Sequence, residues 1–217
     1  MSTSRFVAAL AASVALAVSA GALAEEKVTV TFDDLPEGKA PAGFSFGLTG
    51  KGEPGAWVVR DKALAQTSTD NTDYRFPVAF YDGGSWKDVT VSVRFKAVSG
   101  EVDQAGGLVL RAKDENHYYI VRANALEDNV RIYKVVEGRR KQFSGKNLEV
   151  TPGEWHTLEA TAEGNRFTVR FDGERVIEAT DDTFKDAGKV GLWTKADSVT
   201  LFDDLTIETK DGKATLR

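Results

Sequence analysis

The stretch from Gly106 to Glu208 decides the fold, and it begins GGLVLRAKDENHYYIVRANALEDNVRIY (residues 106–133). Apolar and polar residues alternate over short segments, which is typical of strands with one buried face. Turn residues separate these segments. Asp172-Gly173 lies between two alternating runs, where a two-residue hairpin turn favours positive φ. The pattern predicts an all-β fold, a two-sheet antiparallel jelly-roll sandwich of about a dozen strands.

Strand patterns continue on both sides of this opening. Further strands are expected at Lys27–Phe32, Trp57–Val59, Ala63–Gln66, Val89–Lys96, Trp155–Ala162, Phe167–Phe171, Lys189–Lys195 and Val199–Glu208. Residues 36–54 are rich in Gly, Pro and Lys and predict a loop, while Thr183–Ala187 is the one short segment with helical spacing. The sequences of residues 32–35 and 202–205 are both FDDL, as expected if the first and last strands are neighbours.

The N-terminus has the pattern of a secretory signal. Arg5 precedes an apolar run over residues 6–20, and Ala22-Leu23-Ala24 ends it. A membrane anchor is the alternative, but the run is short for a span. We therefore expect a signal peptide at 1–24, a sandwich domain at 25–209 and a frayed tail at 210–217. The mature protein would be periplasmic or extracellular after cleavage near Ala24.

The composition of the chain argues against two classes of partner, nucleic acid and anionic lipid. The net charge is −5, and the chain contains no Cys. An acidic chain of this kind is a poor match for nucleic acid or for anionic lipid. No apolar run after the N-terminus is long enough to span a membrane. We expect no nucleic-acid partner, no membrane insertion and no disulfides.

Several turn and core motifs carry a family resemblance. They are Gly107–Arg111, Asp114–Tyr119, Arg131–Val135, Glu154–Leu158, Phe171–Gly173, Gly188–Trp193 and Phe202–Asp204. Together they resemble the concanavalin A-like lectin/glucanase superfamily, nearest to laminin-G-like domains and bacterial 3-keto-disaccharide hydrolase-like domains. The resemblance implies two stacked sheets, a concave sheet that commonly holds a saccharide and, in many members, a structural calcium ion.

Period-two alternation divides the strands into two faces. The residues expected to face inward are Leu108, Leu110, Tyr119, Val121, Val130, Ile132, Val190 and Leu192. The opposite face would then carry Arg111, Tyr118, Arg122, Asn124, Arg131, Tyr133, Trp193 and Lys195. Aromatic rings and multi-donor cations are what saccharide recognition requires, so this set is the predicted binding site for an oligosaccharide or another anionic or oxygen-rich ligand. The alternative is an outer sheet face with ordinary cross-strand pairs.

Catalytic residues are not identified. Glu101-Val102-Asp103 begins the Glu-x-Asp-x-x-Glu pattern of laminarinase-type glucanases, but the final Glu is missing, and a solvated loop is the preferred interpretation. His117 is expected in a solvated turn. His156 lies in phase with apolar residues and is interpreted as a neutral His at the core edge, bonded to backbone, rather than as a base.

Asp34 and Asp203 are the calcium candidates, because acidic pairs near two adjoining end strands could begin an oxygen ligand set. An alternative for Asp203, which lies on the apolar phase of its strand, is a Lys, Arg or backbone partner.

Three functions stay open from the sequence. The first is an exported, non-catalytic, lectin-like carbohydrate-binding domain. The second is a glycoside-active hydrolase resembling the 3-keto-disaccharide hydrolases. The third is an envelope protein-interaction domain with a flat apolar patch, for which Trp57, Trp86 and Phe80 are the residues to examine.

Overall fold

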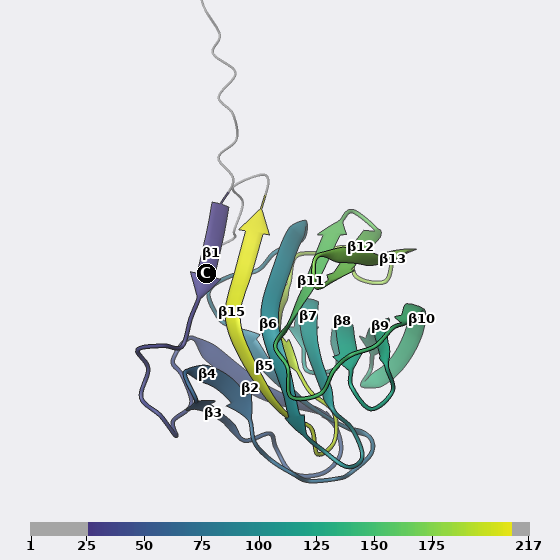
Figure 1. Ribbon diagram of the computed structural model, residues 1–217. Coiled ribbons are helices and arrows are strands. Elements are labelled where there is room, and N and C mark those ends of the chain that lie inside the picture. The colour runs from purple at the N-terminus through teal and green to yellow at the C-terminus, as the bar shows by residue number, and fades with distance from the viewer. Residues whose placement is uncertain (1–25, 210–217) are drawn as a thin grey trace, which may run out of the picture.

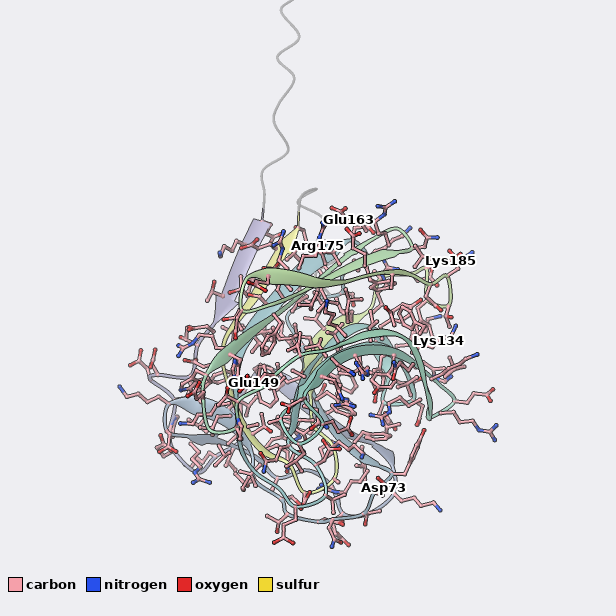
Figure 2. All side chains as sticks on the ribbon, turned by 45° about the vertical axis from the view of Figure 1, so that its right-hand side comes forward. Asp73, Lys134, Glu149, Glu163, Arg175 and Lys185 are labelled. Atoms are coloured by element: carbon pink, nitrogen blue, oxygen red, sulfur yellow. The ribbon has the colours of Figure 1, made fainter. Side chains whose placement is uncertain are left out.

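The computed structural model describes residues 26–209, which form fifteen strands in two stacked antiparallel sheets (Figure 1). This confirms the jelly-roll sandwich that alternation predicted. Side chains fill the space between the layers (Figure 2). In the described range, no helix is long and apolar enough to cross a membrane.

The first sheet has the order β13-β12-β11-β6-β15-β4-β3, and β1 pairs with the other part of β15. Its strands are β1 (Glu26–Val30), β3 (Trp57–Arg60), β4 (Ala63–Gln66), β6 (Val89–Ser99), β11 (His156–Glu163), β12 (Arg166–Phe171), β13 (Glu174–Thr180) and β15 (Val199–Thr209). β1 and β15 run side by side (Figure 1), with Val28 opposite Ile207. The expected pairing of the first and last strands is therefore confirmed.

The second sheet has the order β10-β9-β8-β7-β14-β5-β2. Its strands are β2 (Phe44–Gly50), β5 (Arg75–Tyr81), β7 (Ala105–Asp114), β8 (His117–Asn124), β9 (Asn129–Val136), β10 (Arg139–Asn147) and β14 (Lys189–Trp193). The strands β7 to β10 follow one another as hairpins, so the stretch that opens at Gly106 forms one half of this sheet.

The structure differs from the sequence expectations at four places. Residues 36–54 contain β2, whose alternation was hidden between Gly-rich and Pro-rich flanks. β5 and β10 were not anticipated; β10 is a mostly exposed, basic edge strand without an apolar repeat. Residues 183–187 form no helix, because Phe184 uses its N–H and carbonyl on the Tyr119 hydroxyl and the Arg111 guanidinium instead.

The main core lies between the sheets and contains all eight residues predicted to face inward. A second apolar cluster lies on the outer face of the second sheet. It consists of Phe76, Val78, Phe80, Ala105, Val109, Ala112, Tyr118, Ile120, Tyr133, Val135 and Trp193. Both faces of this sheet are therefore packed, which alternation alone does not reveal.

Turns close over the second apolar cluster. The hydroxyl of Thr49, on β2, donates to the carbonyl of Glu115 in the β7–β8 turn. The Tyr74 hydroxyl donates to the carbonyl of Gly138 in the β9–β10 turn over 3.1 Å. These contacts connect segments from different parts of the sheet across its outer face. The second apolar cluster is therefore covered and is not an open surface.

Candidate functional site

Seven of the eight predicted site residues come together on the outer face of the second sheet. Tyr118, Tyr133 and Trp193 belong to the outer cluster. Arg122 pairs in register with Arg131 across β8 and β9. Asn124 and Lys195 both contact Asp103 at the end of the same face. The period-two assignment thus places residues from three strands and one loop in one region.

Arg111 is the exception, and its predicted position was wrong. It lies at an irregularity in β7 and has φ of 50°, so the alternation changes phase there. Its side chain instead crosses toward β12, 5.6 Å from the ring of Phe167. There it donates to the carbonyls of Lys87, Phe184 and Gly164. Arg111 therefore joins the two sheets and does not line the outer face.

The site residues are more buried than an open sugar-binding platform would require. Trp193 and Tyr118 are fully buried, and Arg122 is 3% exposed. Their polar atoms bond to one another: the Trp193 indole N–H donates to the Tyr118 hydroxyl over 3.3 Å. The turns that close over this face explain the burial, because they lie above the aromatic residues that the sequence pattern placed at the surface.

Arg140, on β10, is a residue that sequence analysis missed. Its guanidinium lies over the rings of Tyr133 at 4.5 Å, Phe76 at 4.7 Å and Trp193 at 5.6 Å. A cation stacked on aromatic faces is favourable, and more so when water is excluded. The only sequence signal is the basic pair Arg139-Arg140, which carries no information without the strand assignment.

Arg122 lies beside the same ring, 5.8 Å from the centroid of Tyr133. One of its nitrogens, Nη2, donates to Glu127 over 2.7 Å and to the Tyr133 hydroxyl over 3.1 Å. Burial alone would lower the pKa of Arg122, but Tyr133 and Glu127 outweigh burial and raise it. We call Arg122, Glu127, Tyr133, Arg140 and Trp193 the Arg122–Arg140 cluster.

Three buried donors of this cluster lack hydrogen-bond partners within the described chain: Nε and Nη1 of Arg122, and Nη1 of Arg140. Burial, together with the charge of Arg122, lowers the pKa of Arg140. Buried polar groups without partners are rare in folded proteins and call for an explanation. A ligand that supplies oxygen acceptors is one such explanation.

A buried ion pair borders the cluster. Lys195 Nζ lies 2.8 Å from Asp103 Oδ2, and Asn124 donates to the other Asp103 oxygen over 2.8 Å. Burial raises the pKa of Asp103, although Lys195 acts in the opposite direction. The interpretation of Asp103 as part of a solvated loop was wrong, because its side chain is 1% exposed; only Glu101 and Val102 are exposed there.

The two histidines have structural contacts. His156 Nε2 lies 3.0 Å from the Thr151 carbonyl, and Nδ1 lies 2.8 Å from Asp172. The predicted backbone bond is therefore present, with a carboxylate as second partner. His117 pairs with Asp114 over 2.9 Å in the β7–β8 turn, at intermediate exposure.

The calcium candidates do not assemble a ligand set. Asp34 is exposed, and Asp203 lies 3.9 Å from Arg94 Nη1. Burial and the nearby charges of Asp204 and Asp33 raise the pKa of Asp203. Between residues 26 and 209, no group of three or more His, Cys, Asp or Glu side chains is arranged to hold a metal ion. These residues therefore do not fit the calcium site that the superfamily resemblance implies.

The profile of the 3-keto-alpha-glucoside-1,2-lyase-like domain matches residues 28–208. The chain belongs to this family. A levanase from Bacillus subtilis (strain 168) is 28% identical over 127 residues, which are 57% of this chain and 18% of the levanase. The chain thus spans under a fifth of that relative.

Two solved structures share the fold. Carbohydrate binding module CBM66 from Bacillus subtilis has a TM-score of 0.63 at 24% identity, over 76% of this chain and 95% of the module. A non-specific endo-β-1,3(4)-glucanase of family GH16 has a TM-score of 0.62 at 13% identity, over 85% of this chain and 91% of the enzyme. Both likenesses support the two-sheet jelly-roll fold and leave activity open.

Proposed function

We propose that the protein is an exported, non-catalytic carbohydrate-binding domain whose ligand binds at the Arg122–Arg140 cluster. The observation that carries the proposal is the set of unpartnered Arg122 and Arg140 donors beside the rings of Tyr133 and Trp193. The likeness to CBM66 and the match to the levanase support a carbohydrate as the class of ligand. Asn124, Arg131, Tyr118 and Lys195 support the cluster from its margins.

The chemistry of the cluster suits a saccharide. A pyranose or furanose offers C–H groups that pack on an aromatic ring and oxygens that accept hydrogen bonds. Guanidinium groups present several N–H donors in a fixed plane, so a few oxygens can satisfy all of them. Arg140 is partly exposed and covers the rings, and displacement of its side chain would admit a sugar to the Tyr133 and Trp193 faces.

Replacing Tyr133 with Ala is expected to weaken oligosaccharide retention about 10-fold or more, because central aromatic residues dominate binding sites of this kind. Val135→Ala is the matched control: Val135 is buried on the same face of the same strand, but outside the Arg122–Arg140 cluster. The measurement is affinity electrophoresis of both variants against neutral and acidic oligosaccharides. Equal retention by the two variants would place binding elsewhere.

A glycoside-active hydrolase is the second candidate, favoured by the family match. The carboxylates beside the cluster are Asp103 and Glu127, and each is held by a cation: Asp103 by Lys195 and Glu127 by Arg122. Such carboxylates are poorly placed as a free acid and nucleophile pair. Release of sugar products from the same oligosaccharide panel would favour this second candidate over the first.

Export is the other part of the proposal. The signal pattern lies in residues 1–24, outside the described part of the chain. Expression in a bacterial host is expected to yield a periplasmic or secreted protein whose N-terminal residue is Glu25. Mass spectrometry of the intact purified protein checks this. A product that keeps residues 1–24 and stays in the cytoplasm would contradict export.

A further inference from the structure

We propose that the Arg122–Arg140 cluster recognises a carboxylate group, and hence that the ligand is an acidic saccharide. This inference rests on the proposed function and specifies the chemical class of its ligand. It is carried by two guanidinium groups on one tyrosine ring, of which only one has a carboxylate partner.

The first step concerns charge. Arg122 and Arg140 both contact the Tyr133 ring, at 5.8 Å and 4.5 Å. Two cations this close repel each other, and the repulsion grows as water is excluded. Glu127 compensates Arg122 through a 2.7 Å ion pair. Within residues 26–209, the Arg140 side chain has no ion pair. The nearby Asp103 carboxylate acts to raise the pKa of Arg140 but is itself ion-paired with Lys195, so Arg140 is the one cation of the cluster that lacks a paired carboxylate.

The second step concerns geometry. The donors without partners belong to both arginines: Nε and Nη1 on Arg122, and Nη1 on Arg140. The two free Nη1 donors belong to different guanidinium groups, and a carboxylate has two oxygens, so one carboxylate can accept from both arginines. A hydroxyl offers one oxygen and carries no charge, so it satisfies fewer of these donors. The pattern therefore favours a carboxylate over a neutral sugar group.

The third step excludes a protein carboxylate as the missing partner. Asp103 is the acidic residue that borders the cluster on the other side. Its Oδ1 accepts from Asn124, and its Oδ2 makes no hydrogen bond but lies 2.8 Å from Lys195 Nζ in an ion pair, so its charge is already compensated. The Arg140 side chain contacts the rings of Phe76, Tyr133 and Trp193 and makes no ion pair, and the residue is at intermediate exposure on an edge strand. A rotamer change of the Arg140 side chain would let an anion enter and contact both Arg140 and Arg122.

The test compares acidic oligosaccharides with their carboxyl-reduced counterparts. Oligomers of galacturonate, glucuronate and mannuronate, each with its reduced neutral form, are titrated calorimetrically into the full chain. At least one acidic oligomer is expected to bind about 10-fold to 100-fold more tightly than its neutral form. Arg140→Gln should abolish this ratio. Arg139→Gln is the matched control, since Arg139 is the exposed neighbour on the same strand and should leave the ratio unchanged.

The outcomes separate the two proposals. If no acidic oligomer binds more tightly than its neutral partner, or if Arg140→Gln keeps the full ratio, the carboxylate inference is overturned. Retention of neutral sugars in that case would leave the proposed function standing. Failure of every saccharide to bind would overturn both. Thermal unfolding of Arg140→Gln in the absence of ligand shows whether lost binding reflects lost folding, and Arg140→Lys should restore only part of the preference.

Discussion

Replacing Arg111 with Ala is expected to lower the free energy of unfolding by about 3–5 kcal/mol. The guanidinium is 1% exposed and donates to three backbone carbonyls, those of Lys87 at 2.8 Å, Phe184 at 2.9 Å and Gly164 at 2.7 Å. Removing it leaves these acceptors without a donor and opens a cavity beside Phe167. Because Arg111 joins β7 to the loops of the other sheet, no neighbouring side chain can replace it.

Two further variants separate the causes of this loss, and urea unfolding measures all three. Arg111→Gly removes the same hydrogen bonds but accepts the φ of 50° without strain, so it should cost about 1 kcal/mol less than Arg111→Ala. Arg131→Ala is the control for removing an arginine of this sheet. Arg131 is half-buried and bonds within its own hairpin, to Asn147, so we expect a loss of about 1 kcal/mol or less. An equal cost for Arg111→Ala and Arg131→Ala would contradict the role of Arg111 in joining the two sheets.

The fold could be predicted from the sequence because alternation is a local signal. In β8 and β9, every second residue is apolar, and the structure places Tyr119, Val121, Val130 and Ile132 in the main core as expected. The same signal failed at Arg111, since a single residue with positive φ changes the phase of all that follows in β7. Sequence alone does not reveal at which position of a strand such an irregularity occurs.

The sequence predicted which residues form the candidate site but did not predict how deeply they are buried. Alternation brings Arg122 and Tyr133 to one face, but the cover over that face depends on contacts between residues far apart in sequence, such as Tyr74 with Gly138. Arg140 was missed for the same reason: its contacts with Phe76 and Trp193 join β10 to β5 and β14, strands that are not its neighbours in the sheet. Local patterns report faces of strands, whereas burial of a face depends on tertiary closure.

Replacing Lys195 with Met is expected to destabilise the protein by about 3 kcal/mol at pH 7, because it leaves the buried carboxylate of Asp103 without its cation. The loss should depend on pH. Burial raises the folded-state pKa of Asp103, and Lys195 is the largest influence that lowers it. In the variant this pKa rises further. A raised carboxyl pKa favours the folded state only while the group is protonated, and the advantage is lost as pH increases through the folded pKa.

The deficit of Lys195→Met should therefore be small near pH 4 and grow toward pH 7, as measured by urea unfolding at each pH. Lys195→Met combined with Asp103→Asn tests the cause directly. An amide keeps an oxygen for the hydrogen bond from Asn124 and carries no charge, so the double variant should regain most of the stability at pH 7 and lose the pH dependence. The second partner of Lys195 is Asp73, labelled in Figure 2; its side chain is 82% exposed and needs no cation, so Asp73→Asn is the control that should change stability little. The contrary result is a loss of stability that is equal at pH 4 and pH 7 and that persists in the double variant. Lys195 would then act through packing of its alkyl chain, and Asp103 would not need Lys195 as a charge partner.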